Sequence, residues 1–203
     1  MKSKDTTSEN AILTAAEQVF INKGYAAART TEIAKLAGVN HSMLHYYFGS
    51  KEELFNKVFS AKLQLFASSI SFVLVDNRLP FIEKIKSVIE THFDFLAENP
   101  RLPLFLFNEM LLSPKKLVML KELVFPKIST AVDFITIEIK AEAEKGNIKQ
   151  VAFLDLLFNI VSQNITTVLI AEILYINQPE EKNAFLQKRK MAIINFSINS
   201  LKI

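Results

Sequence analysis

The chain has 203 residues, of which 50% are hydrophobic and 22% are charged, and its net charge is +3. This is the composition of a globular protein with enough apolar side chains for a core, and the charge alone is too small to indicate a polyanionic partner. The absence of cysteine excludes disulfides, thiolate metal sites and cysteine nucleophiles, and it suits a reducing compartment.

Long apolar stretches at helical spacing, with only four glycines and six prolines, predict an all-α fold. The least charged stretch, residues 156–171, is shorter than the roughly 20 apolar residues of a membrane span and contains several polar residues. It therefore predicts a buried helix. The first residues also lack the apolar stretch of a secretory signal. We expect a cytoplasmic protein with no membrane partner.

Three short helices are expected in the first fifty residues. The first covers residues 8–23, and Gly24 suits the left-handed position that follows a helix end. The second covers residues 31–37 and is broken by Gly38. The third covers residues 41–48. Two short helices joined by a tight glycine-bearing turn are typical of a helix-turn-helix.

The third of these helices has two different sides. Leu44, Tyr47 and Phe48 lie at positions i, i+3 and i+4 and are expected to face the interior. The opposite side carries mid-length hydrogen-bonding side chains, which can contact base edges and phosphates when a helix lies in the major groove of DNA. These side chains belong to His41, Ser42, His45 and Tyr46.

A capping box follows this helix. Ser50 is expected to cap the next helix, and Glu53 to reach back to the backbone N–H of the cap residue. The cap fixes the start of the fourth helix and sets Lys51 beside the third helix, where its ammonium group can meet a phosphate.

The order and spacing of these pieces resemble the DNA-binding domain of TetR-type (TetR/AcrR) transcriptional regulators. The resemblance covers the segment from Ile12 to Phe59 without a gap. The matching residues are Phe20, Gly24, Tyr25, Glu32, Ile33, Ala34, Ala37, Gly38, Val39, Leu44, Tyr47, Phe48, Ser50, Lys51, Glu52 and Leu54.

This resemblance implies a set of DNA-facing residues and three local departures from the family pattern. The family usually has tyrosine at the position of His45, a small hydroxyl residue at Met43, and serine or threonine at Arg29. The last departure removes the usual cap of the second helix, so its start is expected to shift toward Thr30. The residues implied to face DNA are Thr30, Thr31, Asn40, His41, Ser42, His45, Tyr46 and Lys51.

The remaining chain predicts a larger helical domain. We assign residues 1–50 to the helix-turn-helix DNA-binding domain and residues 51–203 to a helical regulatory and dimerisation domain. The last two expected helices, residues 151–176 and 179–201, are apolar on more than one side, which indicates a second copy of the chain as their cover. The TetR resemblance implies the same homodimer. Two symmetry-related recognition helices would then bind a palindromic operator in double-stranded DNA.

The resemblance also implies a cavity for a small-molecule effector in the larger domain. A small apolar or amphipathic molecule that releases a repressor from its operator fits this domain best. A phenylalanine in a helix stripe is nevertheless more often a core residue than a ligand contact, and each polar candidate is more often paired or exposed. The candidate ligand-binding residues are Phe66, His92, Phe93, Phe105, Asn108, Phe134 and Gln163.

Other functions are less well supported by the residues. His41 and His45 stand at i and i+4, a spacing that can bind a metal on a helix, but no third ligand accompanies them and we predict no metal site and no cofactor. No catalytic motif or phosphate-binding glycine loop is found, so we predict no enzyme. The main alternative is a non-specific nucleoid protein or a helical small-molecule-binding protein without operator specificity.

Overall fold

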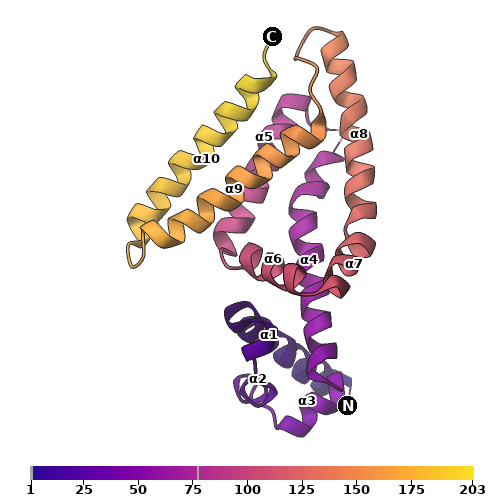
Figure 1. Ribbon diagram of the computed structural model, residues 1–203, viewed down its shortest axis with the longest axis vertical. Coiled ribbons are helices and arrows are strands. Elements are labelled where there is room, and N and C mark those ends of the chain that lie inside the picture. Colours follow the sequence, from indigo (N-terminus) through magenta and orange to yellow (C-terminus); the bar gives the residue numbers. More distant parts are fainter. Residues whose placement is uncertain (1, 77) are drawn as a thin grey trace. The chain divides into compact units, whose positions relative to one another are not determined.

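The computed structural model describes residues 2–76 and 78–203, with side chains from residue 7 onward except that of residue 127. These residues form ten α-helices and no strand (Figure 1), which confirms the predicted all-α fold class. In chain order the helices are α1 (Lys2–Ala27), α2 (Thr30–Leu36), α3 (His41–Phe48), α4 (Lys51–Leu74), α5 (Phe81–Glu98), α6 (Leu102–Leu112), α7 (Pro114–Leu123), α8 (Phe125–Glu144), α9 (Phe153–Leu174) and α10 (Pro179–Leu201).

The chain divides into two compact units, and each unit consists of two segments that are separate in the sequence. Unit 1 contains Met1–Gln64 and Leu104–Leu120, and unit 2 contains Leu65–Pro103 and Lys121–Ile203. Helix α4 contributes to both, because it begins in unit 1 and ends in unit 2. The boundary predicted after residue 50 divides the chain by expected function and does not coincide with the packing units, and it stays a prediction.

Unit 1 is built around an aromatic cluster. The ring of Phe55 contacts the ring of Phe20 edge-on at 4.9 Å between centroids, and the ring of Tyr25 at the same distance. Phe105 from α6 contacts Phe55 and Phe59 at 5.9 and 6.0 Å. Such edge-to-face pairs add stability beyond the apolar area that they bury. This cluster connects α1, α4 and α6 within unit 1.

The first helix differs from its predicted range. Helix α1 spans Lys2–Ala27 and contains a break at Gly24, where φ is 72° and ψ is 173°. The predicted end at residue 23 therefore coincides with this break, but a further helical turn follows it. At the other end the helix begins well before the predicted residue 8. A positive φ is accessible to glycine because it has no Cβ atom.

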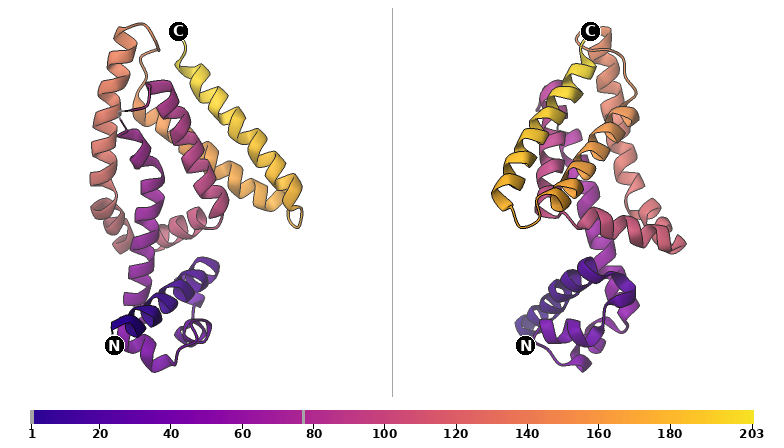
Figure 2. Two further views of the ribbon diagram at one scale, coloured as in Figure 1. Left: turned by 180° about the vertical axis from the view of Figure 1, so that it is seen from behind. Right: turned by 60° about the vertical axis from the view of Figure 1, so that its left-hand side comes forward.

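Unit 2 consists of α5, α8, α9, α10 and the last part of α4. Helix α5 packs against α8, α9 and α10, and α9 and α10 pack against each other across a short turn (Figures 1 and 2). One side of α5 is buried because its apolar residues recur at helical spacing. The buried residues on this side are Phe81, Lys84, Ile85, Val88, Ile89, His92, Phe93 and Leu96.

Two of the described helices, α4 and α9, are long and apolar enough to pass a composition test for a membrane span. Core helices of globular proteins pass the same test. In α9, eight residues are buried, including Asn164 and Thr167, whereas Phe158 and Ile173 are 73% and 74% exposed. A polar group within the buried side suits packing against other helices, and the residues that the structure describes leave the apolar side with Phe158 and Ile173 exposed.

Candidate nucleic-acid interface

Helices α2 and α3 form the helix-turn-helix. Ile33 and Ala34 on α2 are buried, and α2 packs against both α1 and α3. The turn begins where Gly38 adopts a φ of 68°, and the backbone N–H of Val39 donates to the carbonyl oxygen of Ala34 at 3.0 Å. These are the contacts of a left-handed helix cap. They turn the chain sharply enough that only four residues separate the end of α2 from the start of α3.

The start of α2 agrees with the sequence expectation. The helix begins at Thr30, and Arg29 occupies the cap position without a side-chain hydrogen bond to the helix. The expected shift of the helix start toward Thr30 is therefore confirmed. Because the serine or threonine cap is missing, the first backbone N–H groups of α2 lack that side-chain acceptor.

Helix α3 has a buried and an exposed side as its sequence predicts, but Tyr47, expected to face the interior, is only half-buried. Leu44 is fully buried and Phe48 is 6% exposed, so these residues anchor the helix to unit 1. On the other side Tyr46 is 81% exposed, and the remaining polar candidates on this helix are exposed as well: His41, Ser42 and His45. The helix therefore has an exposed polar side, opposite its buried apolar side. We call this exposed side the polar edge of α3, and it consists of His41, Ser42, His45 and Tyr46.

Asn40 holds the N-terminus of α3. Its side-chain oxygen accepts hydrogen bonds from the backbone N–H of Met43 at 2.9 Å and from the hydroxyl of Ser42 at 2.6 Å. The carbonyl oxygen of Asn40 accepts a second bond from the same N–H of Met43 at 3.1 Å. Asn40 thus acts as the helix cap, which limits the part of its side chain that can contact a phosphate.

Replacing Asn40 with alanine is expected to lower the free energy of unfolding by about 1 kcal/mol, the usual cost of losing a helix cap. Urea unfolding followed by circular dichroism measures the change. Ser42→Ala is the matched control, because it removes the 2.6 Å hydrogen bond to the Asn40 side chain and leaves the cap in place. An equal loss in both variants would contradict the capping role.

Each of the two histidines of α3 forms a hydrogen bond through one of its ring nitrogens. Nε2 of His41 forms a 2.8 Å hydrogen bond with the hydroxyl of Thr30, and Nδ1 of His45 forms a 2.7 Å hydrogen bond with the carbonyl oxygen of Gly49. The two rings contact edge-on, with centroids 4.6 Å apart. The polar edge of α3 is therefore ordered before any partner binds, which reduces the entropy lost in recognition.

The capping box after α3 is present as predicted. The backbone N–H of Glu53 donates to the hydroxyl of Ser50 at 3.1 Å, and the backbone N–H of Ser50 donates to a carboxylate oxygen of Glu53 at 2.9 Å. Lys51 lies directly after this cap, with its ammonium 4.5 Å from the centroid of the Tyr25 ring and 3.5 Å from the carbonyl oxygen of Ala26. The ammonium therefore contacts the end of α1, and its expected place beside α3 stays a prediction.

The structure gathers the predicted DNA-facing residues within the segment from the start of α2 to the start of α4. Thr30 and Lys51 are half-buried, and the other six are exposed. Thr30 reaches α3 through the hydroxyl that bonds His41. Contact of these side chains with DNA stays a prediction.

Three of the predicted ligand-binding residues lie together in unit 2. The ring of Phe66 contacts the ring of His92 edge-on at 5.7 Å, and both His92 and Phe93 are buried. Burial lowers the pKa of His92 to about 4, so its imidazole is neutral at pH 7. Nδ1 of His92 and the carbonyl oxygen of Ile89 both lie within hydrogen-bond distance of the side-chain nitrogen of Asn164, at 3.1 and 3.2 Å.

The other predicted ligand-binding residues lie elsewhere. Phe105 belongs to the aromatic cluster of unit 1, and Asn108 is exposed on α6. Phe134 lies on α8 beneath the ammonium of Lys84, 5.0 Å from its ring centroid. Gln163 lies on α9 and donates to the carbonyl oxygen of Asn159 at 3.2 Å. Ligand contact for each of these residues stays a prediction.

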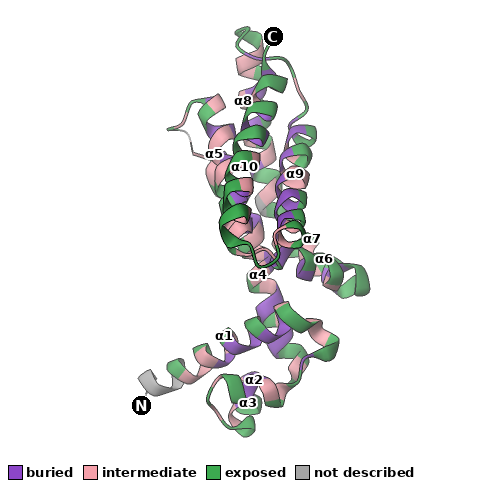
Figure 3. Ribbon diagram, turned by 90° about the vertical axis from the view of Figure 1, so that its left-hand side faces the viewer, coloured by how far each residue is buried: buried purple, intermediate pink, exposed green. Residues whose placement is uncertain are grey.

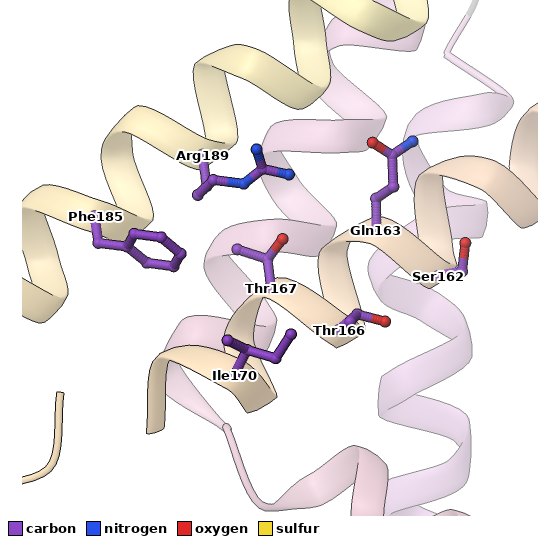
Figure 4. Close-up of a pocket in the computed structure, with 7 residues that line it drawn as sticks. All are labelled: Ser162, Gln163, Thr166, Thr167, Ile170, Phe185 and Arg189. Carbon is purple, nitrogen blue, oxygen red and sulfur yellow. The ribbon is translucent and has the colours of Figure 1, made fainter. Parts of the chain in front are cut away.

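Gln163 lines a groove between α9 and α10 of about 440 Å³. Its hydroxyl and amide groups come from α9, and Phe185 and Arg189 reach it from α10 (Figure 4). This mixture of a cation, hydroxyls and apolar side chains can accommodate polar and apolar groups at once. The residues that line the groove are Ser162, Gln163, Thr166, Thr167, Ile170, Phe185 and Arg189.

Sequence reasoning missed three polar residues that the structure places in notable positions. Lys84 is 1% exposed and forms an ion pair with Glu138, with 2.5 Å between nitrogen and oxygen. Asn164 is fully buried against α5, and Arg189 lines the groove. For Asn164 the available signal is the run of polar residues inside the apolar stretch 156–171. For Lys84 the signal is its position on the apolar side of α5, three residues after Phe81 and four before Val88.

A family comparison identifies the first part of the chain. Residues 12–58 match the family model for bacterial regulatory proteins of the tetR family. The match covers α2, α3 and most of α1, together with the first turns of α4. It therefore includes every residue of the predicted DNA-facing set.

Two curated relatives are similar to about half of the chain. The chain is 34% identical over 91 residues to the HTH-type transcriptional activator FasR of Mycolicibacterium smegmatis, covering 43% of this chain and 40% of that protein. It is 32% identical over 107 residues to the HTH-type transcriptional repressor NicS of Pseudomonas putida, covering 53% of this chain and 50% of that protein. The chain thus spans half or less of the length of these curated relatives.

The whole chain is similar in fold to solved structures. The transcriptional regulator FadR from Bacillus subtilis, solved in complex with stearoyl-CoA, superimposes with a TM-score of 0.68 over 95% of this chain and 98% of that chain. The sequence identity is 21%, so this likeness concerns the fold.

Proposed function

Because the chain belongs to the TetR family of bacterial regulatory proteins, we propose that it is a sequence-specific DNA-binding regulator of transcription, present in the cytoplasm. The observation that carries this proposal is the polar edge of α3. Tyr46 and the two histidines are exposed there, while Leu44 and Phe48 on the opposite side of the helix are buried. A helix of this kind fits the major groove, where base edges carry distinct donor and acceptor patterns.

The functional form is a homodimer assembled through α9 and α10. Each of these helices carries large apolar side chains that this chain leaves exposed, and α10 turns a mostly exposed side to the viewer in Figure 3. Two-fold pairing would cover them in a four-helix bundle. The exposed apolar residues are Leu154, Phe158, Ile170, Ile173 and Leu174 on α9, and Met191 and Phe196 on α10.

Dimerisation determines the form of the operator. Two recognition helices related by a two-fold axis contact half-sites about one helical turn apart, roughly 34 Å, or a multiple of it. The operator is therefore a palindrome. Any change in the separation of the two α3 helices changes affinity without altering a single DNA contact.

A small apolar or amphipathic effector controls this protein. The proposal is supported by the similarity in fold to a regulator that holds stearoyl-CoA and by the apolar surroundings of neutral His92 in unit 2. Shifting a two-state protein from 1:99 to 99:1 requires about 5.5 kcal/mol of differential binding. Helix α4 is unbroken from Lys51 to Leu74, so it offers a continuous element for coupling the effector to the DNA-binding residues.

We place repression, relieved by the effector, ahead of activation, because blocking a promoter requires only occupancy of the operator. The two relatives, one named an activator and one a repressor, support either direction. The competing function is a non-specific nucleoid protein. Titration of a palindromic site against scrambled DNA at fixed salt separates the two, and a specific regulator is expected to prefer its site by at least ~10³.

Four alanine substitutions on this surface are expected to fall into two groups. Tyr46→Ala and Lys51→Ala should weaken binding to all DNA sequences, and loss of the lysine should reduce the salt slope by about 1. His41→Ala and His45→Ala should also change base preference, at a cost of about 1–3 kcal/mol on the preferred site. Fluorescence anisotropy with specific and random duplexes measures both effects.

Lys140→Ala is the matched control for these measurements, because this exposed lysine on α8 pairs only with exposed Glu144 at 3.9 Å among the described residues. It should leave binding unchanged. Equal losses on specific and random DNA for all four variants would contradict the division of roles. Circular dichroism of each variant checks that the helix-turn-helix is still folded.

A further inference from the structure

We propose that His45 reads the amino edge of its target base pair, selecting adenine or cytosine over guanine or thymine on the strand that it faces. The proposal rests on the function argued above and deepens it by naming the chemistry that His45 recognises. It follows from one hydrogen bond, between Nδ1 of His45 and the carbonyl oxygen of Gly49 at 2.7 Å.

This hydrogen bond determines where the imidazole carries its proton. A carbonyl oxygen can only accept, so Nδ1 must be the donor and must carry hydrogen. In a neutral imidazole the other nitrogen then has a lone pair and accepts hydrogen bonds. Among the described residues, Nε2 of His45 forms no hydrogen bond. His45 therefore offers a bare acceptor on the exposed side of α3.

The position of the Gly49 carbonyl is itself fixed. Gly49 adopts a φ of 65° and a ψ of −76°, and its backbone N–H donates to the carbonyl oxygen of His45 at 2.8 Å. A Cβ atom added at Gly49 would lie 2.3 Å from a carboxylate oxygen of Glu53. That carboxylate is held by the capping box with Ser50. Turn, cap and imidazole thus form one connected arrangement of hydrogen bonds.

In the major groove, a hydrogen-bond acceptor can distinguish bases that present an amino group from bases that present a carbonyl oxygen. Adenine presents N6–H₂ and cytosine presents N4–H₂, whereas guanine and thymine present carbonyl oxygens in the corresponding positions. Each base pair therefore carries its amino donor on one strand only. An acceptor facing that strand bonds adenine or cytosine, and it meets an unfavourable oxygen at guanine or thymine.

The tautomer of His41 cannot be assigned in the same way. Its Nε2 is bonded to the hydroxyl of Thr30 at 2.8 Å, and a hydroxyl can donate or accept. The proton of His41 can consequently occupy either nitrogen, and its base preference stays open. This makes His41 the internal control for His45, because the two rings lie on one helix with centroids 4.6 Å apart.

Nuclear magnetic resonance tests the tautomer without any DNA. Long-range ¹H–¹⁵N correlation spectra of the full chain at pH 8, assigned with His45→Gln and His41→Gln, distinguish a protonated Nδ1 from a protonated Nε2. Free histidine side chains are neutral at this pH. The expected result is a protonated Nδ1 and a bare Nε2 at His45. A protonated Nε2 at His45 would overturn the proposal.

Binding selection at pH 8 tests the base readout. A randomised palindrome is selected with the wild-type chain, His45→Ala, His45→Lys and His41→Ala. The position whose preference is lost in His45→Ala should carry adenine or cytosine for the wild type, and His45→Lys, which can only donate, should shift it to guanine or thymine. A wild-type preference for guanine or thymine there, or no change at any position in His45→Ala, overturns the inference.

Base analogues then test the individual atom. Replacing the selected adenine with purine, or the selected cytosine with 2-pyrimidinone, removes the amino group alone. The wild type is expected to lose about three- to tenfold in affinity, the range of one net hydrogen bond, and His45→Ala should lose nothing further. Equal losses in both proteins contradict the inference. Absence of any preferred sequence in the selection instead contradicts the proposed function, on which the inference depends.

Discussion

Phe158→Asp is expected to convert the protein to a monomer and to lower operator affinity at least about 100-fold, the lower end of the gain from linking two binding modules. Phe158 lies on α9 with 73% of its surface exposed, among other exposed apolar side chains. In the proposed dimer this ring is covered by the partner, so a carboxylate at the same place would be buried without a counter-charge. The monomer would keep its contacts with one half-site and lose the linked second one.

Analytical ultracentrifugation measures the association state, and fluorescence anisotropy with a palindromic duplex measures affinity. Phe72→Asp on α4 is the matched control, because Phe72 is 80% exposed and does not belong to α9 or α10. This control should remain dimeric and bind normally. A Phe158→Asp protein that stays dimeric with full affinity would rule out the proposed interface, and monomerisation of both variants would place the interface elsewhere.

The second large effect concerns the ion pair between α5 and α8. Glu138→Ala is expected to lower the free energy of unfolding by about 2 kcal/mol, because it leaves the ammonium of Lys84 buried without its carboxylate. The loss falls below that of a fully buried pair because Glu138 is 24% exposed and water reaches it. Lys84→Met should cost less, since an apolar chain of similar length can pack against Phe134.

Urea unfolding followed by circular dichroism gives both values. Glu144→Ala is the control on the same helix, because its pair with Lys140 is 3.9 Å long and exposed on both sides. It should change stability by no more than about 0.5 kcal/mol. If Lys84→Met proved more destabilising than Glu138→Ala, the explanation by an unpaired buried charge would be wrong.

The helix-turn-helix could be predicted from sequence because its determinants are local. The range of α3, residues 41–48, agrees with the structure at both ends. The capping box of Ser50 and Glu53 spans three residues, and Gly38 marks the turn. Each of these signals acts within one or two helical turns, where spacing alone determines which groups meet.

The core of unit 2 could not be predicted to the same degree. The contact between His92 and Asn164 joins residues 72 positions apart, and the pair of Lys84 and Glu138 joins residues 54 positions apart. No periodicity in either helix specifies the partner. The same holds for the groove of α9 and α10, which depends on the register of two helices and places Arg189 opposite hydroxyl groups from another part of the chain.

The break in α1 has a consequence for biosynthesis. After the left-handed Gly24, the backbone N–H of Tyr25 donates to a carboxylate oxygen of Glu109 at 2.9 Å, and Phe105 completes the aromatic cluster of unit 1. On the ribosome, the segment of α2 and α3 emerges dozens of residues before Phe105 and Glu109. Until α6 has left the exit tunnel, Phe55 and Phe59 lack their contacts with Phe105, and the backbone N–H of Tyr25 lacks its carboxylate acceptor. The packing of unit 1 is therefore completed only after α6 has been made, although α2 and α3 are synthesised before it.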